Sequence, residues 1–472
     1  MNKSIIAASV VAAISGVAFT GTGYADDESK TRQFSKFKQL DESANRADFD
    51  ANAPWKLPRG FSQRIVSDES DLNIYLQPTY TDRSTGIPEA QSNDWHDMNT
   101  VNETGLQAGR FMYRTHEVRG NTERGGTVSV VDLETGEAKV IAEDPSYDAL
   151  DGIVWTPWGT VLFAEETTNG RLFELVPDAN DPSIAAAVID RPAVGRLAHE
   201  GIEVDGAGNV YVVDEYRGRT ESRVSRGNTC GGITPCGGGI YKFVPYVEGD
   251  LSDGELFILK VNGADGIGQG EWVGPIDPLN ARAAGSLAGG QSYQRPEDIE
   301  VIDNVLYVAV TEGPRDVETD LNSGELAFQR ELYEGRVIAI NLDTLKVSDF
   351  IKPGVNVPRE VGRPGDEDHQ TGFDSVDNLA SGPDGSLIVI EDNVPSDIWV
   401  ASTRKVNDLG ASEKVELFAS LTDPSAEGTG IYISPTDPRT LYVNIQHSSV
   451  DDGDGTWAIT RNRSFKRKRD DD

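Results

Sequence analysis

Hydrophobic and polar residues follow one another along this chain in short β-rich runs, and the runs come in pairs separated by tight turns. Residues 151–166, DGIVWTPWGTVLFAEE, contain one such pair, and similar pairs return at residues 200–215, 297–312 and 377–392. Short apolar runs bounded by Gly, Pro, Asn and Asp are typical of β-hairpins. The pattern therefore predicts a hairpin that is repeated at least four times.

Each repeat is bracketed by acidic residues at a constant spacing. The opening acids are Asp151, Glu200, Glu297 and Asp377. The residues 14 and 15 positions later are Glu165 and Glu166, Asp214 and Glu215, Thr311 and Glu312, and Glu391 and Asp392. In an antiparallel hairpin the start of the first strand lies beside the end of the second. The bracketing acids are therefore expected to be neighbours.

Further pairs of β-rich runs follow these inner hairpins, at residues 126–140, 170–176, 239–244 and 335–347. An inner pair and an outer pair together make a four-stranded unit, which must stack on its neighbours to bury its apolar faces. We expect an all-β β-propeller with six four-stranded blades around a central channel, five or seven blades being the alternatives. Rotation about one axis would gather the bracketing acids at one mouth of that channel.

The ends of the chain differ from its repetitive middle. Residues 1–25 carry Lys3, an apolar run over 5–19 and small residues before Asp26, which predicts a cleaved secretory signal peptide. A membrane anchor is the alternative, but a spanning helix needs about 20 apolar residues. Residues 26–53 are expected to form a mobile leader or wrapping arm, 54–460 a single propeller domain, and 461–472 a charged tail. The mature protein is thus predicted to be periplasmic or secreted, without a membrane span.

Composition agrees with many strands joined by tight turns, since 37% of residues are apolar and the chain has 49 Gly and 23 Pro. The 43 basic residues face 78 acidic ones, a net charge of −35 that excludes nucleic acid as a partner. We expect a monomer. Cys230 and Cys236 lie six positions apart, and in an exported chain they predict a disulfide, with a metal-binding pair as the alternative.

Carboxylates crowded at one mouth repel each other, so their arrangement persists only if cations neutralise it. An oxygen-rich set suits hard ions, and Ca²⁺ is the first choice. The candidate metal ligands are Glu117, Asp151, Glu165, Glu166, Glu200, Asp214, Glu215, Glu297, Asp377 and Glu391. His116, His199 and His447 are candidate substrate or metal contacts, with a packed histidine as the alternative for His116. His447 closes the last hairpin where other hairpins have acids.

Arg295 precedes an opening acid and gives the mouth a group that binds phosphate. A guanidinium holds phosphate in a two-pronged fork, while bound metals supply positive charge and lower the pKa of a bound water. The sequence contains no serine nucleophile elbow, Walker loop or dinucleotide fingerprint. A polynuclear metal site that holds a phosphate is the chemistry these residues favour.

Several short motifs resemble those of the PhoX-type alkaline phosphatases, a family of secreted propellers, in the same order along nearly the whole mature chain. They are WTPWGT at 155–160 with Glu165 and Glu166, His199-Glu200-Gly201, YKF at 241–243, Arg295-Pro296-Glu297, DNLA at 377–380, and LYVNIQH at 441–447. The resemblance implies six blades and an iron and calcium cluster that hydrolyses phosphate esters. It further implies that Glu117, Glu166, Glu200 and Glu297 bind metal, that Arg295 contacts phosphate, and that Asp377 and Asn378 bind calcium.

One position departs from the family pattern. Where the family has an iron-binding cysteine shortly before TPWGT, this chain has Asp151, and a carboxylate is a harder donor than a thiolate. We therefore expect several Ca²⁺ ions, with a second hard metal ion as an option and Fe³⁺ disfavoured. The function predicted from the sequence is an exported calcium-dependent hydrolase of phosphate esters. The alternatives are a non-catalytic calcium-stabilised binding propeller and a gluconolactonase-like calcium-dependent esterase.

Overall fold

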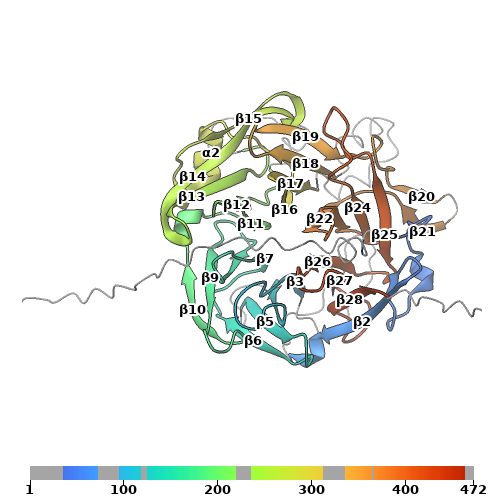
Figure 1. Cartoon of the computed structure of the whole chain (residues 1–472). Coiled ribbons are helices and arrows are strands. Elements are labelled where there is room, and N and C mark those ends of the chain that lie inside the picture. Colours follow the sequence, from blue (N-terminus) through green and yellow to red (C-terminus); the bar gives the residue numbers. More distant parts are fainter. Residues whose placement is uncertain are drawn as a thin grey trace, which may run out of the picture.

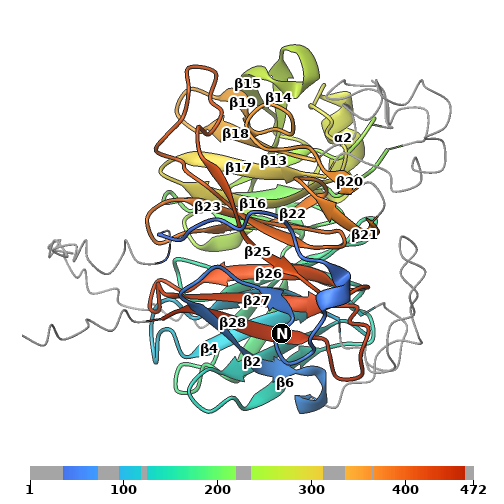
Figure 2. The ribbon, with the colours of Figure 1, turned by 90° about the vertical axis from the view of Figure 1, so that its right-hand side faces the viewer.

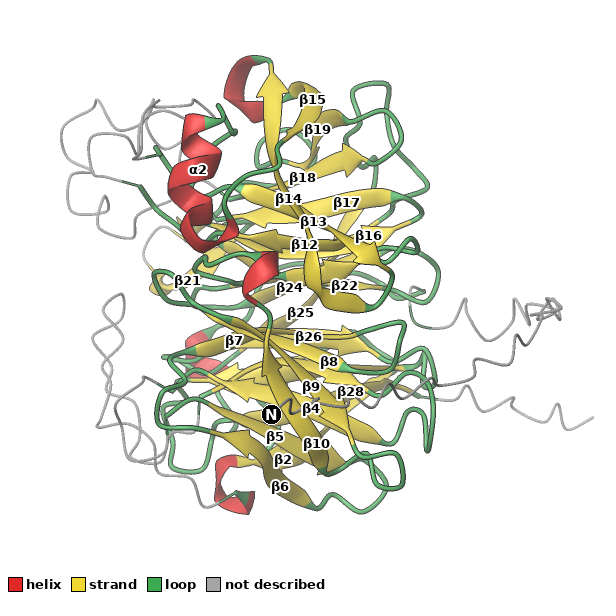
Figure 3. Cartoon of the chain, turned by 90° about the vertical axis from the view of Figure 1, so that its left-hand side faces the viewer, coloured by secondary structure: helices red, strands yellow, loops and turns green. Residues whose placement is uncertain are grey.

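The computed structural model describes residues 34, 36–72, 95–118, 125–218, 235–311, 335–363 and 366–462, and of residues 361–370 only the backbone where it is described. Its sheets form a ring, with the first strand of each unit near the axis and later strands toward the rim (Figure 1). Strands dominate the side view (Figure 3). The predicted all-β, propeller-like arrangement is confirmed. The expected signal peptide, and residues 463–472 of the expected tail, lie outside the described residues.

Two sheets in the first half of the described chain each contain four consecutive antiparallel strands. One is β3 (His96–Val101), β4 (Phe111–His116), β5 (Thr127–Asp132) and β6 (Ala138–Glu143). The next is β7 (Leu150–Trp155), β8 (Val161–Glu165), β9 (Leu172–Pro177) and β10 (Ala185–Asp190).

A nine-stranded sheet follows, in the order β11-β12-β13-β14-β15-β19-β18-β17-β16. Its first five strands are β11 (Ile202–Val204), β12 (Val210–Val213), β13 (Ile240–Val247), β14 (Asp250–Asn262) and β15 (Gly268–Val273). The others are β16 (Pro296–Ile302), β17 (Val305–Val310), β18 (Arg336–Asn341) and β19 (Lys346–Ile351). Only two residue pairs, Gly268 with Val347 and Gln269 with Lys346, join β15 to β19. Two four-stranded units thus meet edge to edge through β15.

Strands from the N-terminal part complete the last two sheets. One contains β22 (Val376–Ser381), β23 (Leu387–Glu391), β24 (Asp397–Ala401) and β25 (Val415–Leu421), with β1 (Trp55–Lys56) outside β25. The other contains β26 (Glu427–Ile433), β27 (Thr440–Gln446) and β28 (Gly455–Arg461), with β2 (Phe61–Asp68) outside β28. Pairing of the two ends of the chain closes the ring.

The remaining elements are short. A two-stranded sheet pairs β20 (Val361–Arg363) with β21 (Asp366–Thr371). The helical elements are α2 (Ala281–Leu287) and the 3-10 turns η1 (Arg46–Asp48), η2 (Glu69–Asp71), η3 (Pro192–Val194), η5 (Ala264–Gly266) and η6 (Pro278–Asn280). Among the described helices, none has the length and apolar character that crossing a bilayer requires.

The hydrophobic core lies between neighbouring sheets. Phe163 and Tyr113 pack in the cluster between the β3–β6 and β7–β10 sheets, and Met112 and Tyr442 pack where the last sheet meets the first. Strand β8 is buried along its whole length, which explains its continuous run of apolar residues. Neighbouring sheets pack on both faces of the strands near the axis. This packing fixes the positions of the strand ends that carry the acids.

The N-terminal segment before β1 lies against the side of the ring (Figure 2). The Leu40 amide donates to the Leu417 carbonyl at 3.0 Å, and the Ala44 amide donates to Ser420 Oγ at 2.7 Å. Phe34 packs on Phe418 with ring centroids 5.2 Å apart. Phe34, Leu40 and Ala44 thus contact the β22–β25 sheet.

Candidate metal and phosphate site

The two ends of each inner hairpin lie side by side, as their spacing predicts. The Glu166 amide donates to the Ala149 carbonyl at 2.8 Å, and the Glu215 amide donates to the Ala198 carbonyl at 2.8 Å. Corresponding bonds run from Glu117 to Trp95 (3.0 Å), from Thr311 to Arg295 (3.0 Å) and from Asp392 to Ser375 (2.7 Å). Five hairpins therefore present their closing residue beside their opening residues.

A β-bulge at the start of four inner strands places an acid inside the irregularity. The register shifts between Leu150 and Ile153, between Pro296 and Ile299, and between Val376 and Leu379. A fourth shift lies between His96 and Asn99. Bulges redirect side chains at strand ends. Asp151, Glu297, Asp377 and Asp97 each occupy the first bulged position, and their carboxylates are brought together at the axis.

Close approach of neighbouring inner strands requires glycine after two of these acids. A Cβ at Gly152 would lie 1.7 Å from the carbonyl oxygen of Glu200, and one at Gly201 would lie 2.5 Å from the Ile299 nitrogen. Any side chain at either position would force the strands apart. The Asp151-Gly152 and Glu200-Gly201 pairs thus combine a carboxylate with the close packing that positions it.

Two groups of carboxylates meet at this end of the ring and share one member. Asp151, Glu166 and Glu200 form the first, and Glu200, Glu297 and Asp377 form the second. In each group the ligand oxygens lie within 4.8 Å of one another. We call these five residues the acidic ring. The structure thus brings together all four opening acids identified from the sequence spacing.

The buried acids of this region hold their protons more tightly than exposed carboxyls. Burial raises the pKa of Glu297 to about 8, although the charge of Arg295 opposes the shift. Burial together with the neighbouring charges of Asp97 and Glu166 raises the pKa of Asp151 well above its usual value. Burial and then Asp151 and Glu297 do the same for the pKa of Glu200. Like charges and desolvation therefore oppose full ionisation of the acidic ring without a cation.

Two oxygens of the acidic ring have no hydrogen-bond donor. Asp151 Oδ1 and Glu297 Oε2 are buried and unpartnered, and the two residues are 4% and 0% exposed. A buried acceptor without a donor costs about 1–3 kcal/mol, more when it is charged. Hard divalent cations, which bind several carboxylate oxygens at once, fit this donor set. A thiolate-bound metal does not, since none of the described ring members is a cysteine.

Arg295 lies next to the acidic ring and is held by carboxylates from three hairpins. Its Nε lies 2.7 Å from Glu215 Oε1 and 2.5 Å from Glu297 Oε1, and its Nη1 lies 3.6 Å from Asp392 Oδ2. Burial lowers the pKa of Arg295, but Glu297, Glu215 and Asp392 outweigh burial and raise it well above its usual value. The guanidinium remains charged and is aimed by its neighbours.

Side chains alternate between the two faces of a strand, so the two acids that close each hairpin point to opposite sides. Glu166 joins the acidic ring, whereas Glu165 accepts from Arg171 Nη2 at 2.5 Å. Glu215 contacts Arg295, whereas Asp214 accepts two bonds of 2.6 Å from Arg282. Asp392 contacts Arg295, whereas Glu391 accepts from Trp399 Nε1 at 2.9 Å. The structure does not bring Glu165, Asp214 or Glu391 into the acidic ring, because adjacent strand residues face opposite sides.

Two further candidates named from the sequence lie near the acidic ring. Glu117 is close enough that its charge raises the pKa of Asp97 and of Asp151, after burial. Asn378 Oδ1 accepts from Thr429 Oγ1 and from the Gly430 amide, both at 2.7 Å. Asn378 therefore joins two inner strands.

The three histidines have different settings. His116 Nε2 lies 2.7 Å from Ser129 Oγ, and His199 Nε2 donates to the Gly195 carbonyl at 3.1 Å. Burial lowers the pKa of His199 to about 4. His447 Nε2 lies 3.5 Å from Glu427 Oε1, and its ring stands edge-on to Trp95. His199 has the setting of a packed, neutral histidine, His116 is buried against Ser129, and His447 pairs with an acid.

The expected disulfide includes Cys230, which lies outside the described residues, so this pairing stays a prediction. Cys236 is fully buried.

Three residues of the site were not among the candidates named from the sequence, although Asp392 was identified there as a closing acid. Asp97 opens the first inner hairpin, and burial followed by the charge of Glu117 raises its pKa to about 7. Asp392 contacts Arg295, and Arg217 Nε lies 3.8 Å from Glu215 Oε1. The position within the hairpin repeat could have identified two of them, because Asp97 corresponds to Asp151 and Asp392 corresponds to Glu166. Arg217 does not occupy a position that recurs in the repeats, so the repeat pattern could not identify it.

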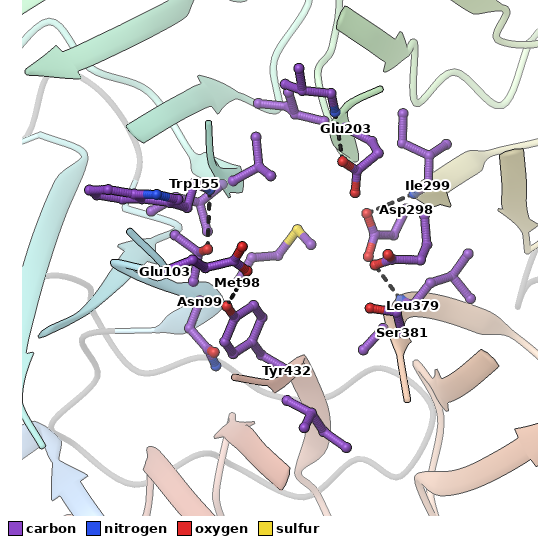
Figure 4. A pocket seen from close by; sticks show the side chains of 18 of the residues that line it. Met98, Asn99, Glu103, Trp155, Glu203, Asp298, Ile299, Leu379, Ser381 and Tyr432 are labelled. Atoms are coloured by element: carbon purple, nitrogen blue, oxygen red, sulfur yellow. Dashed lines mark hydrogen bonds between the residues drawn. The ribbon is translucent and has the colours of Figure 1, made fainter. Parts of the chain in front are cut away.

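A cavity of about 480 Å³ occupies the channel beyond the bulges, lined by the inner strands (Figure 4). Glu103, Glu203, Asp298 and Glu300 line it together with apolar side chains such as Met98 and Trp155. Asp298 accepts from the Ile299 and Leu379 amides at 2.7 and 2.8 Å, and Glu103 accepts from Tyr432 Oη at 2.6 Å. These acids are engaged by backbone and hydroxyl donors, unlike the unpartnered oxygens of the acidic ring.

Comparison with known proteins identifies similar chains. The family described as alkaline phosphatase PhoX matches residues 170–449. The structure resembles Pseudomonas fluorescens PhoX in complex with vanadate, a transition state analogue, with a TM-score of 0.55 at 18% identity, covering 90% of this chain and 98% of that one. A search of curated proteins finds no match.

Weaker structural likenesses have TM-scores below 0.5. One is to a Thermus thermophilus protein described as an oxidoreductase (glucose dehydrogenase), with a TM-score of 0.42 at 14% identity over 85% of this chain and 100% of that one. Another is to a Bacteroides thetaiotaomicron protein of unknown function, with a TM-score of 0.41 at 9% identity over 85% of this chain and 76% of that one.

Proposed function

We propose, from the premise that this chain belongs to the alkaline phosphatase PhoX family, that it hydrolyses small phosphate esters at the acidic ring. The observation that carries the proposal is the position of Arg295, a largely buried cation that contacts Glu297 of the acidic ring. A guanidinium in such a setting binds a phosphate as a planar fork. Phosphate is therefore the ligand that the combination of acids and arginine suits best.

The acidic ring, with Glu117 and Asp97 beside it, would hold several Ca²⁺ ions. The unpartnered Asp151 Oδ1 and Glu297 Oε2 support this assignment, because both are acceptors for which the described chain supplies no donor. When bound, calcium supplies positive charge to phosphate oxygens and lowers the pKa of a coordinated water. A second hard metal ion also fits an all-oxygen site, and Fe³⁺ is the less favoured candidate because Asp151 stands where the family pattern has an iron-binding cysteine.

Arg295 would orient the phosphate, and Glu215 and Asp392 would orient Arg295. Its Nε contacts Glu215 and Glu297, and the weaker 3.6 Å approach of Nη1 to Asp392 leaves that nitrogen able to turn toward a substrate oxygen. Arg217 would add a second positive charge beside Glu215. Two guanidiniums in one acidic site favour a dianionic phosphate monoester.

We further infer that the nine-stranded sheet is two blades joined through β15, which makes six blades in all. The two-pair contact between β15 and β19 supports this division. We also propose that the protein is exported as a monomer, since residues 1–25 have the pattern of a signal peptide and the acid-rich chain suits a calcium-rich compartment.

The proposal is tested with purified full-length mature protein, 4-nitrophenyl phosphate and added CaCl₂, with and without EGTA. Arg295→Ala is expected to lower kcat/KM by 100-fold or more while the protein remains folded in calcium. Arg295→Lys is expected to recover part of the loss, because lysine keeps the charge but not the fork. Arg196→Ala serves as the matched control, since Arg196 forms a similar pair with Asp190 away from the acidic ring, Nη2 to Oδ2 2.6 Å.

Hydrolysis that EGTA abolishes and Arg295→Ala suppresses would support the proposal. Calcium binding without turnover of the monoester or of bis(4-nitrophenyl) phosphate, with any metal supplement, would instead indicate a binding propeller. Turnover of a lactone but of neither phosphate ester would indicate a gluconolactonase-like esterase.

A further inference from the structure

The turn between β23 and β24 carries a second set of buried oxygens without donors, separate from the acidic ring. Its sequence from 391 to 397 is EDNVPSD. Glu391 Oε2, Asn393 Oδ1 and Asp397 Oδ1 are all buried and lack a hydrogen-bond partner. Glu391 is 0% and Asp397 1% exposed. Three unpartnered acceptors on seven consecutive residues require an explanation.

Strand register brings the two carboxylates together. Ile390 pairs with Ile398 and Val389 with Trp399, without a shift, so Glu391 and Asp397 lie opposite each other at the turn end of the hairpin. Residues opposite each other on one face have Cβ atoms about 5 Å apart. Trp399, two positions after Asp397, donates to Glu391 Oε1, which confirms that Glu391 faces this side. This is the side away from Asp392 and Arg295.

The other contacts of the turn fix its polar atoms. Asn393 Nδ2 donates to Glu360 Oε2 at 2.8 Å, so the amide orientation is set and Oδ1 points elsewhere. Glu391 Oε1 also accepts from the Asp374 amide at 3.0 Å. Ser43 Oγ of the N-terminal segment donates to Asp397 Oδ2, and Ser43 is fully buried. Each carboxylate thus has one satisfied oxygen and one unsatisfied oxygen.

A single proton shared within the cluster cannot satisfy it. One proton joins two of the three unpartnered oxygens and leaves the third without a donor. Neither Glu391 nor Asp397 forms an ion pair with a Lys or Arg of the described chain. A hard divalent cation accepts all three oxygens at once, with backbone carbonyls or water filling its other positions.

We propose that Glu391, Asn393 and Asp397 bind one Ca²⁺ ion that holds the N-terminal segment against the β22–β25 sheet. Ser43 couples the two functions, because its hydroxyl contacts the Asp397 carboxylate and its carbonyl accepts from Lys56 Nζ at 2.9 Å. The ion is structural and does not depend on the proposed phosphatase reaction. Its loss is expected to loosen residues 36–48 while the acidic ring remains intact.

Metal content tests the proposal. Full-length mature protein is equilibrated with CaCl₂, passed through gel filtration and analysed for calcium. Asp397→Asn and Asn393→Ala are expected to bind one equivalent fewer than wild type. Glu174→Gln is the matched control, because Glu174 is equally buried but its oxygens are satisfied by Arg191, Thr160 and Trp158. It is expected to keep the full complement.

Trypsin cleavage at Lys36, Lys38 and Arg46 provides the second measurement. In calcium, wild type and Glu174→Gln are expected to resist cleavage, and the two turn variants to be cut at least tenfold faster. Asn393→Ala keeps every charge and is half-buried, so it decides the matter if Asp397→Asn does not fold. Unchanged calcium content together with unchanged cleavage in Asn393→Ala would overturn the proposal.

Discussion

Individual acidic residues in this chain divide by the face of the strand on which they stand. Glu166 and Glu215 face the axis, whereas Glu165 and Asp214 face arginines between the sheets. Composition alone cannot make this distinction, because both members of each pair are acidic and adjacent. The bulge that carries Asp151 adds a second local cause, since it turns the side chain into the acidic ring.

Asp151→Asn is expected to weaken calcium binding at the acidic ring by tenfold or more, because an amide lacks the charge that the cation neutralises. The same change should stabilise the metal-free protein at pH 8 by at least about 1 kcal/mol, since it removes a buried carboxylate whose pKa is raised well above normal. Calcium titration and urea unfolding in EGTA measure the two effects. Weaker calcium binding without any gain in metal-free stability would contradict the assignment of Asp151 as an unpaired charge.

At the scale of the hairpin, the sequence predicted the repeat and its opening acids. It did not predict which of the two acids that close a hairpin points away from the axis. The spacing of 14 residues placed Asp151 next to Glu165 and Glu166 correctly, since Leu150 pairs with Glu165 and the Glu166 amide reaches Ala149. Which of the two adjacent acids faces the axis depends on the alternation of side chains along the closing strand, and two acids in a row do not reveal which one that is. Arg171 and Arg282 come from other segments, so the partners of Glu165 and Asp214 were not readable from the repeat.

Asp214→Asn is expected to lower stability while leaving calcium content unchanged. Asp214 is fully buried and accepts two bonds of 2.6 Å from Arg282, and breaking a buried ion pair by removing one partner costs about 3–5 kcal/mol. Urea unfolding in saturating calcium measures the stability, and elemental analysis measures the metal. Loss of a calcium equivalent in this variant would show that Asp214 binds metal in the folded protein.

At the scale of the whole molecule, the ring gathers charges that a chain of net charge −35 would otherwise keep apart. Its architecture was predictable because every unit repeats the same hairpin pattern. The closure of the ring of sheets was not predictable, because β1 and β2 lie far in sequence from their partners β25 and β28. The N-terminal contacts with the β22–β25 sheet were equally hidden, since residues 36–53 have no β period.

Removing calcium should make the stability of the whole ring depend on pH. Burial raises the pKa of Asp97 and Asp298 to about 7 and of Glu203 and Glu297 to about 8. Unfolded carboxyls titrate near pH 4, so between about pH 4 and pH 8 the folded state binds more protons than the unfolded state. Stability is then greatest below pH 4 with respect to these groups and falls as pH rises through 8.

The melting temperature in EGTA is therefore expected to decrease steadily from pH 5 to pH 8. With saturating calcium, the acids that bind metal are neutralised by the ions rather than by protons, and the decrease should be much smaller. The difference between the two melting temperatures should grow with pH. Equal pH dependence with and without calcium would mean that the buried acids keep their protons in the calcium-treated protein, and that the acidic ring does not bind the ion.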